Sequence, residues 1–244
     1  MIEILFVGVL ITGMLTEIIS KKLEKYQQII ISYSIAIVLT LISTHILPEL
    51  FSGQNHNIGY FLLIGFILQI LLELLSKGIE HGHVHIKGKI SNKELIVIFI
   101  GLSIHSFIEG LPIHTFEVVN PHYNSINLDS FSWIYLFTIL IHKLPIAAVL
   151  IIFLNSINSK YSLKIIFLLL FAISSPAGAF FGEYLLNFEI FKNWSNNFLA
   201  ISCGMLLHIT TLLIFEEHHH SKGKLKNILT ISAGIVSGIL IFSF

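Results

Sequence analysis

Long apolar runs recur along the whole chain, and they constrain its fold more than any other feature. Stretches of roughly 18 or more mostly apolar residues follow one another, each long enough to cross a bilayer as a helix. Apolar residues make up 55% of the 244 residues and charged residues only 11%. A soluble domain of this length needs more polar surface than that. The sequence therefore predicts an all-α membrane protein with a single domain over residues 1–244.

We predict eight transmembrane helices, separated mostly by short polar breaks. The predicted spans cover residues 2–20, 29–51, 58–76, 94–116, 130–156, 163–187, 196–216 and 225–243. No basic region of the kind that a cleavable signal peptide needs precedes the first run, so we expect this run to be retained as a helix. The longer connection at about 77–93 contains His81, His83 and His85. Imidazoles this close together can bind metal weakly, as an auxiliary site.

Lysines lie almost entirely in alternate connections, and this asymmetry predicts the orientation of the chain. Twelve lysines follow the first, third, fifth and seventh spans, whereas the other connections hold only Lys192. Because basic loops stay in the cytoplasm, both termini should be extracytoplasmic and the histidine-rich loop cytoplasmic. We expect a multi-pass protein of a bacterial cytoplasmic (inner) membrane. The formal net charge of zero gives no reason to expect nucleic acid as a partner, and a homodimer is left open.

Ionisable side chains inside the predicted spans indicate a functional site. A charged side chain at the centre of a bilayer costs about 2.5–3.5 kcal/mol, so such residues are rare and usually line a pathway. His105 and Glu109 are four residues apart and share one helix face, as do His45 and the glutamate four residues after it. Imidazole and carboxylate together suit zinc, and His142 in the next span is the candidate third ligand. His208 is either a ligand or a packing residue.

Lys143 is a second unusual residue, since it lies near the middle of its predicted span. An ammonium group there needs a carboxylate partner or it loses its proton. We expect Glu109 to be that partner, and the alternative is a water-filled vestibule that the lysine reaches.

Prolines follow the candidate ligands at a constant distance. Pro48, Pro112 and Pro145 each lie three residues after a histidine or glutamate of the candidate site. Each proline removes a backbone donor, which predicts a freed carbonyl one turn earlier, for example that of Ile108. Broken helices are tolerated in a bilayer where they line a cavity, so we expect kinks at the depth of the site.

Four short motifs resemble those of the ZIP (Zrt/Irt-like) metal transporter family. Residues 105–110 (HSFIEG) resemble the family's H-[NS]-x-x-[ED]-G signature, and residues 142–145 (HKLP) its H-[EK]-x-P signature. Residues 45–49 (HILPE) are similar to the H-x-L-P-E segment, and residues 175–178 (SPAG) to the S/E-P-x-G motif. The motifs occur in the family's order, so the resemblance covers essentially the full chain.

The resemblance implies a ZIP-like bundle that moves divalent metal into the cytoplasm and is not an enzyme. His105, Glu109 and His142 correspond to metal ligands of the family, and Ser106 lies at a position that is often asparagine. Zn²⁺ is the expected substrate, with Fe²⁺, Mn²⁺, Cd²⁺ and Co²⁺ as alternatives.

This chain departs from the family pattern at a second metal site. Many prokaryotic members bind two adjacent metals, with acidic residues at the positions that Lys143, Ile146 and Ser175 occupy here. The resemblance therefore implies one transported metal, with Lys143 replacing the second. His45, His208, Ser106 or water would then have to complete the coordination of the first.

Alternating access without ATP is the expected mechanism, because the chain has no phosphate-binding loop of the G-x-x-x-x-G-K-[ST] type. Uptake should weaken as the pH falls, since imidazole binds metal only when it is neutral. Two other functions stay open. One is a membrane-embedded zinc-dependent hydrolase, in which a coordinated water attacks the substrate, and the other is a metal sensor without net flux.

Overall fold

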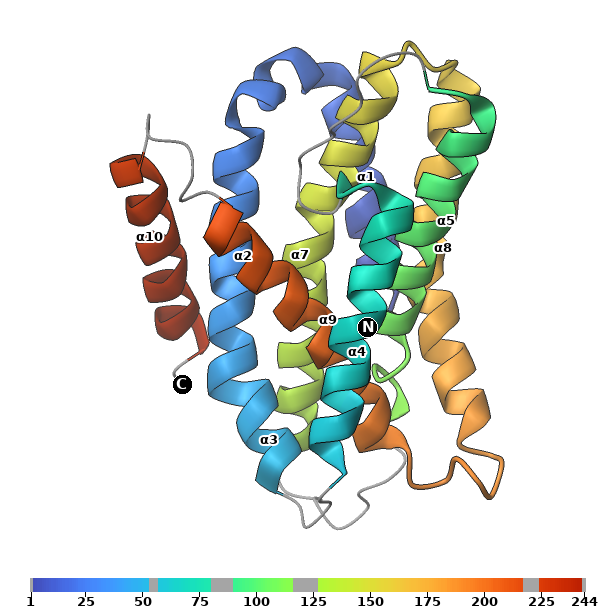
Figure 1. Cartoon of the computed structure of the whole chain (residues 1–244), viewed down its shortest axis with the longest axis vertical. Coiled ribbons are helices and arrows are strands. Elements are labelled where there is room, and N and C mark those ends of the chain that lie inside the picture. The colour runs from blue at the N-terminus through green and yellow to red at the C-terminus, as the bar shows by residue number, and fades with distance from the viewer. Residues whose placement is uncertain (1, 53–56, 80–89, 116–126, 217–223, 243–244) are drawn as a thin grey trace.

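The computed structural model describes residues 2–52, 57–79, 90–115, 127–216 and 224–242, and its elements there are all helical (Figure 1). The prediction of an all-α protein is confirmed. In chain order the elements are α1 (Ile2–Leu23), η1 (Glu24–Tyr26), α2 (Gln27–Leu41), η2 (Ile42–Ile46), α3 (Leu47–Ser52), α4 (Ile58–Ser76), α5 (Asn92–Gly110), α7 (Asn127–Ser156), α8 (Tyr161–Leu185), α9 (Ser195–Glu216) and α10 (Lys224–Phe242).

Several of these helices are long and apolar enough to cross a membrane. The stretches that meet this test in the described part of the chain are Ile2–Ser52, Ile58–Ser76, Ser132–Ser156, Tyr161–Leu185 and Leu225–Phe242. Helices α5 and α9, of 19 and 22 residues, are comparable in length but more polar, and α5 carries Lys93, Glu94 and Glu109. The chain is thus a multi-pass membrane protein, and the count of eight spans and the placement of the termini stay predictions.

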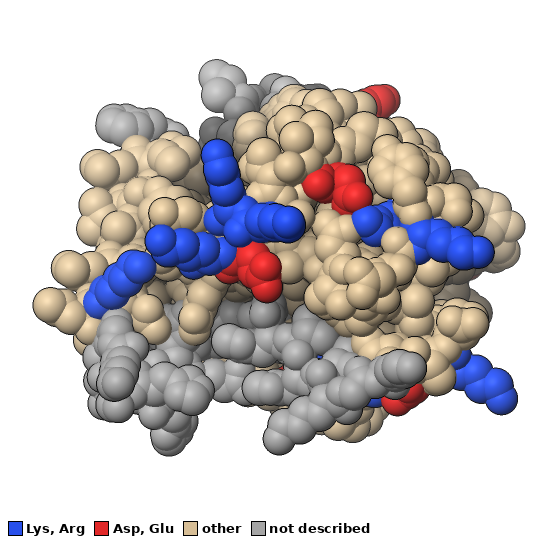
Figure 2. Space-filling view, turned by 90° about the horizontal axis from the view of Figure 1, so that it is seen from above, with Lys and Arg blue, Asp and Glu red and all other residues tan. Residues whose placement is uncertain are grey.

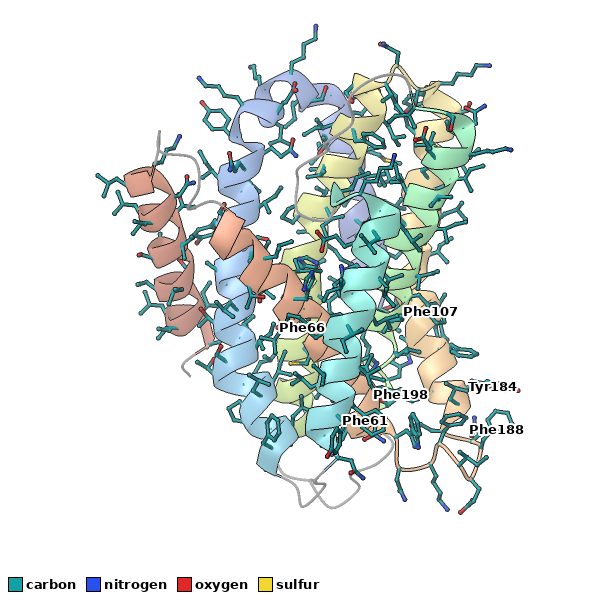
Figure 3. The ribbon with its side chains drawn as sticks, viewed as in Figure 1. Phe61, Phe66, Phe107, Tyr184, Phe188 and Phe198 are labelled. Carbon is teal, nitrogen blue, oxygen red and sulfur yellow. The ribbon has the colours of Figure 1, made fainter. Side chains whose placement is uncertain are left out.

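The two ends of the bundle differ in the side chains that they present. Figure 2 shows lysines gathered over the end where α1 meets α2 and α7 meets α8. At the opposite end Phe61, Phe198, Tyr184 and Phe188 lie close to the ends of their helices (Figure 3), and Trp194 packs edge-to-face on Phe61. Aromatic side chains are typical of the boundary between lipid and water. The lysine-rich end and the aromatic end therefore lie near opposite membrane surfaces.

Helices pack in pairs around the centre of the bundle. Helix α4 lies along α9, α5 along α8, α1 along α7, and α10 along α2. Glycines allow very close approaches of these helices, including the one between α5 and α8. A Cβ atom on Gly110 would lie 2.1 Å from the carbonyl oxygen of Ser175, and one on Gly178 only 1.9 Å from that of Phe107. Small residues let membrane helices touch backbone to backbone, so this contact determines where α5 lies.

Two apolar clusters fill the bundle, one toward each end, and a polar layer separates them. The cluster residues that border this layer are Leu102 on α5 and Ile113 just after it, Ile146 and Ile139 on α7, and Ala172 and Ala179 on α8. His105, Glu109, His142 and Ser175 all lie in these gaps and are buried. Four chemically active side chains are thus held at one depth, away from both ends.

The three prolines lie in different helical contexts, and one of them follows the end of a helix. Helix α7 continues through Pro145, so the chain is not broken there, and a kink at this position stays a prediction. Pro48 lies in the first turn of α3, directly after the π-helical turn η2, which carries the chain into α3 without a break. Helix α5 does end at Gly110, two residues before Pro112. A membrane helix can tolerate a proline where neighbouring helices surround it, as they do in α7.

The glycine contact between α5 and α8 can be tested by adding one methyl group. We expect Gly178→Ala to destabilise the protein by about 1–3 kcal/mol, because the new Cβ cannot fit against the Phe107 carbonyl without moving a helix. The measurement is the thermal unfolding midpoint in detergent. Gly59→Ala is the matched control, since no atom lies within 4 Å of its Cβ position. Equal midpoints for the two variants would contradict the close packing.

Candidate metal centre

Three buried side chains from two helices come together in the polar layer. His105 and Glu109 come from α5 and His142 from α7, with side-chain exposures of 1%, 0% and 1%. One ligand atom from each lies within 4.8 Å of the other two. Nε2 of His105 is 3.0 Å from Oε1 of Glu109, and Nε2 of His142 is 3.6 Å from the same oxygen. The structure therefore groups the three side chains that the sequence pattern singled out as ligands.

The Glu109 carboxylate is buried and faces two imidazoles, but none of the described residues gives it a hydrogen bond in suitable geometry. Both of its oxygens, like Nε2 of His105, lack a hydrogen-bond donor or acceptor in suitable geometry among the described residues. A buried ionised carboxylate is costly unless a positive charge compensates it, and neutral imidazoles carry none. A divalent cation between Glu109 and the two imidazoles would remove that cost, which makes this group a candidate metal centre.

The separations between the Glu109 oxygen and the two imidazole nitrogens suit a small cation such as zinc. Zinc bonds to nitrogen and oxygen of about 2.0–2.2 Å put the ligand atoms of a tetrahedral site about 3.3–3.6 Å apart. The observed 3.0 Å and 3.6 Å separations bracket that range. Three protein ligands leave one position for water, the arrangement of a zinc site that exchanges a ligand.

The end of α5 determines how Glu109 is held. Pro112 cannot continue the α-helical hydrogen bonds, so the chain tightens after Gly110. The amide of Leu111 donates to the carbonyl of Ile108 at 3.1 Å, so the carbonyl that we expected to be freed is satisfied. The backbone carbonyl of Glu109 instead accepts a hydrogen bond of 2.8 Å from the hydroxyl of Tyr135 on α7.

Tyr135, which lies on α7, connects the C-terminal end of α5 to α9 as well. Its hydroxyl also lies 2.6 Å from Oγ of Ser202 on α9, and Tyr135 and Ser202 are both buried. Sequence reasoning did not identify Tyr135, because an aromatic residue in an apolar span carries no signal of a polar contact.

A second ligand-supporting residue that the sequence analysis missed is Gln69 on α4. Its amide oxygen lies 2.7 Å from Nδ1 of His105, and its side chain is fully buried. A polar amide within the apolar run of residues 58–76 was the available signal.

Lys143 is buried beside the three-residue group, but its partner differs from the one we expected. No direct ion pair joins Lys143 to Glu109 within the described residues, although the Glu109 carboxylate is the charge that acts on this ammonium. Nζ of Lys143 donates to Oγ of Ser106 and lies 4.8 Å from the centre of the Phe171 ring. A hydroxyl and an aromatic face both stabilise an ammonium, and they lie on the side of Lys143 that faces α5 and α8.

Ser175 extends the contact between Lys143 and Ser106. Oγ of Ser175 donates to the backbone carbonyl of Ser106 at 2.7 Å and lies 3.4 Å from Oγ of Ser106. The hydroxyl of Ser106, a predicted ligand, is therefore engaged by Lys143 in this arrangement. Ile146, at the other position where the family carries an acid, is part of an apolar cluster.

The other predicted ligands lie elsewhere. Nε2 of His45 is 3.0 Å from the backbone carbonyl of Phe242 on α10, and Nε2 of His208 is 2.7 Å from Oε2 of Glu73 on α4. Neither histidine belongs to the group of three. His45 lies in η2 and His208 on α9, and their contacts with α10 and α4 follow from the rotation of these elements, which residue spacing along one helix does not determine. His81, His83 and His85 lie outside the described residues.

Comparison with known proteins agrees with this geometry. A bundle of membrane-spanning helices with a buried imidazole–carboxylate group defines a class, the membrane proteins that handle metal ions. A family model described as ZIP zinc transporter matches residues 80–244, about two thirds of the chain. The chain belongs to the ZIP family, which is a family of divalent metal transporters and not of hydrolases.

The matched region contains every residue of the three-residue group, whereas His45 precedes it. No curated protein and no solved structure gives a significant match.

The support that Tyr135 gives to Glu109 can be tested by removing one oxygen. We expect Tyr135→Phe to lower the unfolding free energy by about 0.5–1.5 kcal/mol, because the Glu109 carbonyl and the Ser202 hydroxyl lose a buried partner. Thermal unfolding of the purified variant measures the effect. Tyr33→Phe is the control, since the Tyr33 hydroxyl bonds to Ser237 at an exposed position. A smaller loss for Tyr135→Phe than for Tyr33→Phe would contradict this role.

Proposed function

We propose that this protein carries a divalent metal ion, with Zn²⁺ as its main substrate, into the cytoplasm through the site on α5 and α7. One observation carries the proposal. His105, Glu109 and His142 form a buried ligand group at the middle of a membrane bundle, in a chain that belongs to a metal transporter family. Nitrogen and oxygen ligands together suit zinc and leave the other first-row divalent ions as weaker candidates.

Alternating access is the mechanism that a site of this kind requires. The ligands are almost fully buried, so an ion cannot reach them from either end in the arrangement described here. A hydrated cation would exchange its water for His105, Glu109 and His142 when the bundle opens toward the aromatic end. The bundle would then open toward the lysine-rich end, which the distribution of lysines assigns to the cytoplasm.

Lys143 supports a single bound metal. Its ammonium lies against Ser106, next to Ser175, where the family resemblance locates a second metal site. A positive charge there repels a second cation and occupies its space. We therefore infer that one metal ion is carried in each cycle.

The ligand assignment can be tested by zinc uptake into proteoliposomes. We expect His105→Ala and Glu109→Ala each to reduce uptake to that of protein-free liposomes, because two protein ligands are too few to compensate for dehydrating the ion. His114→Ala is the matched control. His114 follows α5 closely in the sequence but pairs with Glu183 and is not one of the three proposed ligands. The His114→Ala variant should therefore retain uptake. Unchanged transport in the His105→Ala, Glu109→Ala double variant would refute the proposal.

The number of bound metals is a separate prediction. We expect elemental analysis of zinc-saturated protein to give one zinc per chain at the central site, and none there in His142→Ala. The imidazoles of the histidine-rich segments at 81–85 and 218–220 can bind zinc weakly, so the measurement uses a background in which these histidines are replaced by alanine. Two tightly bound zinc ions in that background would contradict the role given to Lys143.

A zinc-dependent hydrolase and a metal sensor make different predictions in the same experiment. A hydrolase keeps its zinc through turnover and releases a lipid product, and a sensor binds zinc without accumulation inside the vesicles. Zinc that exchanges and accumulates supports transport.

A further inference from the structure

The contact between Gln69 and His105 joins two helices that otherwise have different main partners. Gln69 is on α4, which packs chiefly along α9, and His105 is on α5, which packs chiefly along α8. Both side chains are buried, and the 2.7 Å separation of Oε1 and Nδ1 is that of a good hydrogen bond.

A glycine brings the two helices close enough for this contact. A Cβ atom on Gly101 would lie 3.0 Å from both the Leu75 side chain and the Ser76 amide nitrogen, and 3.2 Å from the Leu72 carbonyl oxygen. Helices α4 and α5 run in opposite directions (Figure 1). One turn further along α5 is His105, and one turn back along α4 from Leu72 and Glu73 is Gln69. The crossing at Gly101 therefore puts the amide beside the imidazole.

The hydrogen bond specifies which nitrogen of His105 carries the proton. An amide oxygen only accepts hydrogen bonds, so Nδ1 of His105 must be the donor. A neutral imidazole has one N–H, and Nε2 then carries the lone pair that a metal needs. Nε2 is the atom that faces Glu109 at 3.0 Å, and the two atoms are not in hydrogen-bond geometry. A lone pair opposite a carboxylate oxygen is unfavourable until a cation lies between them.

We propose that Gln69 is a positioning residue for metal binding, which holds His105 in the tautomer with its proton on Nδ1 and its Nε2 lone pair directed into the site. The proposal rests on the function proposed above, because it assigns Nε2 of His105 to the metal. Histidine ligands in metal sites are regularly oriented through a hydrogen bond from their second nitrogen, and loss of that bond weakens metal affinity about 10–100-fold. Since the acceptor comes from another helix, the affinity of the site depends on how α4 lies against α5.

The first measurement is the ¹⁵N spectrum of histidine-labelled, metal-free protein in detergent, in which the two ring nitrogens report the tautomer. The signals of His105 are assigned by their absence in His105→Ala. We expect protonated Nδ1 and unprotonated Nε2 in the wild type. In Gln69→Leu, which has no acceptor, the proton should shift toward Nε2, and in Gln69→Glu, which keeps an acceptor oxygen, it should return to Nδ1.

The second measurement is the zinc dissociation constant of the same proteins in the background without the histidine-rich segments. We expect a rise of about 10–100-fold in Gln69→Leu and a smaller rise in Gln69→Glu. Gln28→Leu is the control, because it makes the same substitution at an exposed position of α2. Gln69→Asn, with a shorter acceptor, replaces Gln69→Leu if the latter does not fold, as judged by size-exclusion chromatography.

The results separate this inference from the function on which it rests. Wild-type tautomer and affinity in Gln69→Leu, together with lost zinc binding in His105→Ala, would overturn the role of Gln69 alone. Wild-type zinc binding in His105→Ala would overturn both. A proton found on Nε2 of His105 in the wild-type protein would also overturn the inference, because Nδ1 would then be the metal-binding nitrogen.

Discussion

Glu109 places a carboxylate between two apolar clusters, and the surrounding structure is organised around its burial. The group is too deep to reach water, and no described residue donates a hydrogen bond to its oxygens. With its proton on Nδ1, the neutral imidazole of His105 directs a lone pair toward this carboxylate, and that is unfavourable unless a cation binds both groups. The polar layer is therefore stable in the presence of the ion that it binds, which couples occupancy of the site to the packing of α5 and α7.

Close helix contacts make this arrangement possible. Gly178 lets the backbone of α8 touch that of α5, and Gly101 lets α4 approach α5 from another direction. Helix α5 is thus held on two sides by backbone contacts, which in a membrane supply packing where the hydrophobic effect between helices is weak. The polar supports of the site, Gln69 and Tyr135, reach it from α4 and α7 only because α5 is held at this depth.

Lys143 gives the polar layer its second distinctive feature. Most buried ammonium groups lie against a carboxylate, whereas this one lies against a serine hydroxyl and the face of Phe171. Glu109 remains without a lysine in direct contact, so its oxygens stay available to a metal ion. A direct Lys143–Glu109 ion pair would have neutralised the carboxylate and competed with the substrate. The hydroxyl that holds Lys143 belongs to Ser106, one turn of α5 before Glu109. This arrangement leaves the Glu109 carboxylate available as a metal ligand.

The sequence alone determined the features that depend on local geometry. Apolar runs long enough to cross a bilayer predicted helices, and four-residue spacing put His105 and Glu109 on one face, because α-helical periodicity is the same in every context. His142 was the candidate third ligand because it is an ionisable residue within the next apolar run, and the family-like motifs supported it. Tertiary structure decided which side chains meet across helices. The Lys143–Ser106 contact, the displacement of His45 and His208 from the site, and the supporting roles of Gln69 and Tyr135 all depend on helix rotation and depth. Those are determined by glycine contacts between segments distant in sequence, and a periodic pattern within one helix carries no information about them.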